Sequence, residues 1–71
     1  MSPKTTKVPK FYFLKKMNKV HRVCRKEMEG YISLNEERIH HFEYGRVPNH
    51  RTYKIVLKNG DEKIWELKRK N

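Results

Sequence analysis

Residues 53–67 have the sequence YKIVLKNGDEKIWEL, in which two short apolar runs flank a turn signal. Large apolar side chains alternate with others in residues 53–57, as in a strand with one buried face. Asn59-Gly60 supplies the positive backbone φ that a tight turn requires, and residues 64–67 return with a second apolar run. This stretch predicts an antiparallel β-hairpin.

Two registers of this hairpin are available. A two-residue turn would pair Ile64 with Ile55, but it would divide the large apolar residues between the two faces. A three-residue loop over 58–60, with a bulge at its glycine, places Tyr53 opposite Trp65. This second register is favoured because it gathers one apolar face, which consists of Tyr53, Ile55, Leu57, Trp65 and Leu67.

Further upstream, apolar residues recur at intervals of three or four, the spacing of one helical face. These residues are Phe13, Met17, Val20, Cys24, Met28 and Tyr31. Pro9 suits a first helical turn and Gly30 a C-terminal cap, so the pattern predicts a helix over 9–30. Its lysines gather at the N-terminal end, however, where the helix dipole disfavours them. Residues 11–14 would also suit a strand that turns at Asn18.

The next segment fits two structures. Ser33 and Glu36 have the spacing of a capping box, which would begin a helix over 34–44. The apolar positions in that range do not form one helical stripe. Strands over 31–34 and 38–44, joined by a turn, fit them better, and we favour this hairpin.

Together these segments predict an α+β domain. A basic N-terminal helix packs on a small antiparallel sheet of about four strands, arranged as a β-meander. Residues 45–51 contain Gly, Pro and Asn and are expected to form a loop between the hairpins. Residues 1–8 are expected to be a flexible basic tail, and residues 9–71 a single small domain.

The charge distribution divides the 71-residue chain at Glu27. Nine basic residues and no acidic residue precede Glu27, whereas nine basic and eight acidic residues occupy the remainder. The first part therefore carries +9 of the formal net charge of +10. Such asymmetry indicates a polyanion, or an acidic protein surface, as the partner of this part.

Nucleic acid, either DNA or RNA, is the leading partner, bound through phosphates with little sequence specificity. The expected contact residues lie in the N-terminal arm and in the loop over 45–51. They are Lys10, Lys15, Lys16, Lys19, Arg22, Arg25 and Lys26 in the arm, with Arg46 and Arg51 in the loop. Tyr12 lies among these residues and would be available to stack on a base.

A second hypothesis is a non-enzymatic inhibitor or adaptor, of the kind that phages and mobile elements encode. It would dock on an acidic patch, or on a nucleic-acid channel, of a partner protein. The two hypotheses differ in salt dependence, which is steep for phosphate contacts and weaker for a buried protein interface. The single thiol and the exposed aromatic residues also allow a homodimer.

The sequence predicts no enzyme, no cofactor and no metal site. It contains neither a Gly-rich phosphate loop nor an arrangement typical of a nucleophile. His21 and Cys24 are three residues apart, but no second short pair of ligands completes a zinc site. The longest apolar run, residues 11–14, is too short to span a membrane. A single cysteine and no secretory segment favour the reducing cytoplasm.

Overall fold

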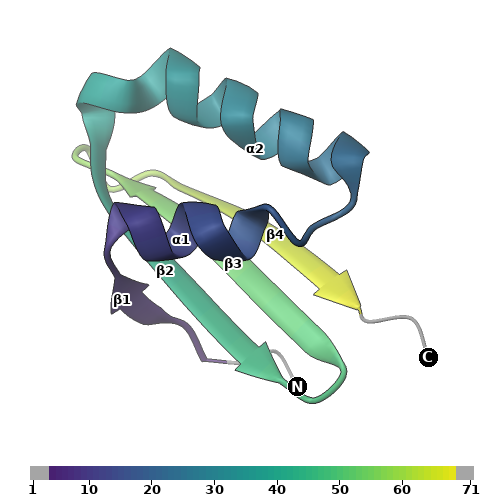
Figure 1. Ribbon diagram of the computed structural model, residues 1–71. Helices are drawn as coiled ribbons and strands as arrows, with labels where there is room; N and C mark the ends of the chain where they lie inside the picture. The colour runs from purple at the N-terminus through teal and green to yellow at the C-terminus, as the bar shows by residue number, and fades with distance from the viewer. Residues whose placement is uncertain (1–3, 69–71) are drawn as a thin grey trace.

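The structure is a computed structural model that describes residues 4–68. Within these residues, two α-helices lie on one face of a four-stranded antiparallel sheet (Figure 1). The elements in order are β1 (Thr6–Val8), α1 (Lys10–Met17), α2 (Arg22–Asn35), the 3-10 turn η1 (Glu36–Arg38), β2 (Ile39–Val47), β3 (His50–Leu57) and β4 (Glu62–Lys68). The strand order in the sheet is β1-β2-β3-β4. The predicted α+β class, with helical cover on a small antiparallel sheet, is confirmed.

The first strand lies in the stretch that we expected to be a flexible tail. Thr6–Val8 pair with residues 42–44 of β2, and the prediction is wrong for these three residues. Threonine and valine have β-branched side chains that suit a strand, and pairing satisfies their backbone groups. The rest of the predicted tail includes residues 1–3, which lie outside the described residues.

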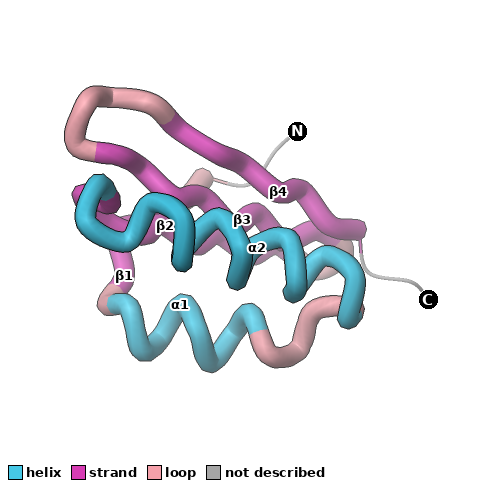
Figure 2. Tube along the Cα trace, turned by 90° about the horizontal axis from the view of Figure 1, so that it is seen from above, coloured by secondary structure: helices cyan, strands magenta, loops and turns pink. Residues whose placement is uncertain are grey.

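The predicted single helix is two helices. The chain leaves α1 after Met17 and enters α2 at Arg22, so the two helices run antiparallel across the sheet (Figure 2). His21 caps the second helix, because its Nδ1 accepts a hydrogen bond of 3.3 Å from the backbone N–H of Val23. A straight helix over 9–30 would be about 33 Å long. The longest strands reach only about 30 Å, so the reversal keeps both halves of the apolar stripe over the sheet.

Residues 31–34 continue α2 and do not form a strand. Ile32 lies one helical turn after Met28, and both side chains are buried. The favoured hairpin over 31–44 is therefore wrong in its first strand, and the alternative helix over 34–44 is wrong as well. The second predicted strand, 38–44, corresponds to β2. The strand that the prediction lacked is β1.

The C-terminal hairpin is confirmed in its predicted register. Tyr53 lies opposite Trp65, and Gly60 has a φ of 95°. The backbone N–H of Leu57 donates to the carbonyl oxygen of Asp61 at 2.8 Å, which closes the hairpin around a three-residue loop. The alternating apolar residues of β3 and β4 thus face the helices, as expected.

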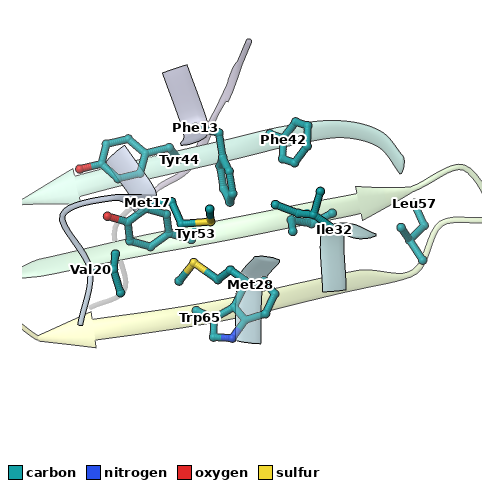
Figure 3. Packing of buried hydrophobic residues seen from close by; sticks show 11 residues of the cluster. Phe13, Met17, Val20, Met28, Ile32, Phe42, Tyr44, Tyr53, Leu57 and Trp65 are labelled. Atoms are coloured by element: carbon teal, nitrogen blue, oxygen red, sulfur yellow. The ribbon is translucent and has the colours of Figure 1, made fainter. Parts of the chain in front are cut away.

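The core lies between the helices and the sheet (Figure 3). Phe13 of α1 is completely buried, and its ring lies 4.8 Å from that of Phe42 and 5.7 Å from that of Tyr53. The Tyr53 hydroxyl donates a hydrogen bond of 3.1 Å to the carbonyl oxygen of Lys16, near the end of α1. Burial, followed by the neighbouring Tyr44, raises the pKa of Tyr53 above its ordinary value. The core therefore fixes the end of α1, where basic residues follow.

Candidate nucleic-acid interface

The α1–α2 linker, the β2–β3 turn and the end of β4 lie at one end of the molecule (Figure 1). Basic side chains gather at this end. A hollow of about 350 Å³ at this end is lined by Lys19, His21, Arg51 and Lys68, together with Val20, Glu66 and Leu67. We call this region, with the adjoining Arg46 and Lys16, the basic end. Glu66 is the one acidic side chain among these lining residues, so the hollow is suited to an anion.

The two arginines of the basic end lie on neighbouring strands. Arg46 of β2 is directly opposite Arg51 of β3, and Val47 is opposite His50. The predicted loop over 45–51 is therefore wrong, since both strands continue to a tight turn at Pro48-Asn49. The sequence predicts both arginines as contact residues of a loop, and strand pairing places them opposite each other instead. Like charges directly opposite each other destabilise a sheet, and a bound phosphate would relieve this repulsion.

Lys16 extends the basic end along α1. Its ammonium nitrogen lies 5.3 Å from the ring centroid of Tyr12 and 6.0 Å from that of Tyr44. Tyr12 is half-buried and meets Tyr44 edge to face at 6.1 Å. The Tyr12 ring, which was expected to stack on a base, is therefore partly covered by Lys16 and Tyr44. Phe11 is the exposed aromatic residue of α1, with 73% of its surface accessible.

The other basic residues of the arm do not form one stripe, because the chain reverses between α1 and α2. Lys10 lies at the opposite end of α1 and forms an ion pair of 3.8 Å with Glu36. Arg25 donates a hydrogen bond of 3.3 Å to the carbonyl oxygen of Asn18, so it braces the linker beside the basic end. The remaining basic residues of the predicted set are exposed on the helices; they are Lys15, Arg22 and Lys26.

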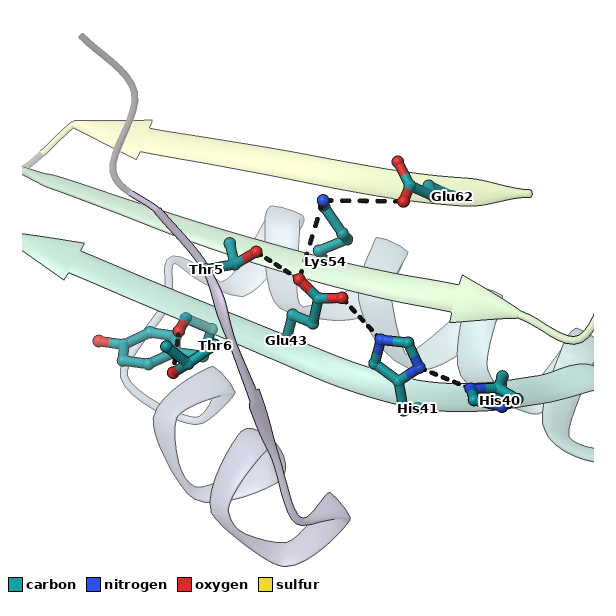
Figure 4. Close-up of polar contacts among 8 residues, drawn as sticks. Thr5, Thr6, His40, His41, Glu43, Lys54 and Glu62 are labelled. Atoms are coloured by element: carbon teal, nitrogen blue, oxygen red, sulfur yellow. Dashed lines mark hydrogen bonds and ion pairs between the residues drawn. The ribbon is translucent and has the colours of Figure 1, made fainter. Parts of the chain in front are cut away.

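The outer face of the sheet has a different electrostatic character (Figure 4). Glu43 accepts hydrogen bonds from the Thr5 hydroxyl and from His41, and the Lys54 ammonium lies 3.8 Å away. Lys54 also lies 3.7 Å from Glu62. The bond from Thr5, followed by that from His41, lowers the pKa of Glu43 below its ordinary value of 4.5. The charges of Glu43, Lys54 and Glu62 are thus paired with each other, in contrast to the like charges of Arg46 and Arg51 at the basic end.

Residues 4–68 hold neither a cluster of metal-ligand side chains nor a helix of membrane-spanning character. No group of three His, Cys, Asp or Glu side chains within residues 4–68 is arranged to hold a metal ion. Cys24 is partly buried against the core, and His21 points its Nδ1 to the backbone of α2. Over the same residues, no helix has the length and apolar character needed to cross a bilayer.

Two residues of the basic end were not predicted from the sequence. The sequence indicates His21 only as a metal ligand, and Lys68 is not among the expected contact residues. Lys68 joins the hollow because β4 ends opposite His50, beside the β2–β3 turn. Neither a family model nor a curated protein nor a solved structure matches this chain.

Proposed function

We propose that this protein binds nucleic acid through the phosphates, with the basic end as the main contact surface. The observation that carries the proposal is the convergence of Lys19, Arg51 and Lys68 around one hollow, with Arg46 directly opposite Arg51. These residues come from four segments of the chain, the α1–α2 linker and strands β2, β3 and β4. Their like charges repel each other in the unbound protein, and a phosphate backbone compensates this cost.

The expected binding mode is governed by charge. Lys and Arg side chains that neutralise phosphates release counterions, and each contact with duplex DNA contributes about 0.9 to the log–log salt slope. Five cations, Lys16, Lys19, Arg46, Arg51 and Lys68, would give a slope of about −4.5 if each contacts one phosphate. Contacts of this kind go to the phosphate backbone, which carries no sequence information directly, so little sequence specificity is expected.

The proposal is tested by neutralising the arginine pair while keeping side-chain length. The double variant Arg46→Gln/Arg51→Gln should weaken binding and reduce the salt slope by about 1.8, because two phosphate contacts are lost. Arg38→Gln/Lys58→Gln is the matched control, since it removes the same two charges from exposed positions at the opposite end of the sheet, where the Lys58 N–H donates to the Arg38 carbonyl oxygen at 2.7 Å. This variant should bind like the parent. Equal effects of the two changes would show that net charge alone drives binding and would remove the site assignment.

The alternative function, an inhibitor or adaptor that docks on an acidic protein surface, uses the same basic end. It would give no binding to any nucleic acid at low salt, together with tight binding to one protein partner. Cytoplasmic location is part of the proposal as well, because the single cysteine suits a reducing compartment.

A further inference from the structure

The two edges of the sheet are built differently. β1 is three residues long and is followed at once by Pro9. β4 is seven residues long, pairs with β3 without a register shift and contains neither proline nor glycine. Natural sheets protect an edge by making it short, bulged or proline-containing, or by placing charged side chains on it. Among the described strands, β4 lacks the first three devices, and its charged residues would admit only a strand with complementary charges.

The backbone of β4 is oriented for such pairing. The Leu57 N–H donates to the Asp61 carbonyl, so Asp61 directs its hydrogen-bonding groups toward β3. Hydrogen bonding alternates along an antiparallel strand. Glu62 and Ile64 therefore direct their backbone N–H and C=O groups away from β3, toward the outer edge.

An apolar groove runs beside this edge on the helical side of the sheet. It has a volume of about 410 Å³ and is lined by Lys26, Glu27, Gly30, Tyr31, Leu34, Lys63 and Trp65. Leu34 is 85% exposed, and Tyr31 meets Trp65 edge to face at 5.7 Å. On the opposite side of the same edge, Ile64 is 45% exposed. Apolar side chains on both sides of a strand edge would be covered by an added strand.

We propose that the partner at this edge is a second copy of the chain, paired antiparallel through β4 with Trp65 opposite Trp65. Among the registers centred on residues 64, 65 and 66, the charges of β4 favour this one. It places Glu62 of each copy opposite Lys68 of the other, which gives two attractive pairs. If Ile64 lay opposite Ile64 of the other copy, Glu62 would lie opposite Glu66. If the pairing were centred on Glu66, Glu66 would lie opposite Glu66 of the other copy. Both alternatives bring like charges together.

This register also suits the side chains on the helical face. The residues on either side of Trp65 direct their backbone N–H and C=O groups toward the outer edge, so Trp65 itself does not. The two Trp65 residues of the dimer therefore form a non-hydrogen-bonded pair, in which opposed side chains approach most closely. Leu67 of one copy comes opposite Lys63 of the other and covers the end of the apolar groove. The two basic ends lie far apart in this dimer. Each is next to the β3–β4 turn of the other copy, which contains Asp61 and leads into Glu62 of β4.

The test measures the oligomeric state of the full chain by sedimentation over a range of concentrations. Glu62→Lys and Lys68→Glu should each raise the dimer dissociation constant about tenfold, since two attractive pairs become repulsive. The double variant Glu62→Lys/Lys68→Glu should restore association. Tighter association of Glu62→Lys alone would contradict the register, because it is expected when Glu62 faces Glu66. A parent chain that stays monomeric at millimolar concentration would overturn the proposal.

A backbone variant tests the edge independently of charge. Ile64→Pro removes an N–H that points away from β3, so the hairpin should persist while strand addition is blocked. The expected result is a monomer with an unchanged circular dichroism spectrum. Ile64→Thr, which retains the N–H, is the matched control and should remain dimeric. The inference does not depend on nucleic-acid binding, because sedimentation is measured without nucleic acid.

Discussion

Gly45 offers a direct test of whether the N-terminal segment is part of the folded domain. A Cβ atom at position 45 would lie 2.4 Å from the carbonyl oxygen of Lys4 and 2.9 Å from its carbonyl carbon. Both atoms belong to the backbone, so no side-chain rotation relieves the overlap. Gly45→Ala therefore forces the segment that leads into β1 away from β2.

The magnitude follows from the contact that is lost. Moving this segment breaks the hydrogen bond from Thr5 to the Glu43 carboxylate, and a hydrogen bond to a charged group contributes about 1.5–3 kcal/mol. Alanine gains about 0.5–1 kcal/mol over glycine within a strand. The net destabilisation of the full chain should be about 1–2 kcal/mol, which lowers Tm by roughly 5–15 °C for a domain of this size.

The assay is thermal and urea denaturation of Gly45→Ala in two backgrounds, the full chain and a chain that lacks residues 1–5. The shortened chain has no carbonyl to meet the new methyl group, so there the substitution should stabilise by about 0.5 kcal/mol. Gly30→Ala is the matched control. Gly30 lies in α2, and a methyl group added there would meet nothing within 4 Å, so alanine should stabilise both chains by about 1 kcal/mol. If Gly45→Ala has the same effect in both backgrounds, the packing of residues 4–5 on β2 is wrong.

Three further predictions concern single side chains. Gly60→Ala should destabilise the fold by about 1 kcal/mol, because Gly60 has a φ of 95° that L-residues rarely adopt. Urea denaturation measures this loss, and Gly60→Asn should recover part of it. Tyr53→Phe should cost about 1 kcal/mol by removing the hydrogen bond to Lys16, and an unchanged unfolding free energy would exclude that bond. The pKa of Glu43 is lowered by folding, so Glu43 stabilises the fold above about pH 4.5 and loses this effect as the pH falls through its folded-state pKa. The stability difference between the parent and Glu43→Gln should therefore shrink below pH 4.5, and a difference that grows on acidification would contradict the hydrogen-bonding pattern.

The C-terminal hairpin could be predicted because its signals are local. The Asn59-Gly60 turn and the alternation around it determine a register, and the requirement for one apolar face resolves the choice between two turns. The helical stripe from Phe13 to Met28 was also informative, since Phe13 and Met28 are completely buried. Periodicity of this kind reports which side chains face the core, and it does so even when the chain changes direction.

The reversal between α1 and α2 could not be predicted from that periodicity. The apolar residues keep their intervals of three or four through Val20, so the spacing does not mark a break. Residues 18–21 also contain neither glycine nor proline. What decides the reversal is the length of the strands that form later in the chain. Strand β1 was missed for a similar reason, because its pairing with β2 depends on the close approach of Lys4 to Gly45.

The candidate site was predicted in its residue types and only partly in its arrangement. The charge asymmetry pointed to the N-terminal arm, yet the basic end combines Lys19 of the linker with Arg51 and Lys68 from two strands. Long-range strand pairing brings these residues together, and composition carries no information about it. Lys10, in contrast, pairs with Glu36 at the other end of α1.

The most direct test of the proposed function is the salt dependence of binding. Fluorescence anisotropy would be measured with labelled duplex DNA, single-stranded DNA and structured RNA, from about 50 to about 300 mM salt. The proposal predicts binding to at least one of them, with a log–log slope of about −4 to −5 for duplex DNA that becomes shallower by about 1.8 in Arg46→Gln/Arg51→Gln. No binding at the lowest salt concentration, despite a net charge of +10, would contradict the proposal and favour a protein partner.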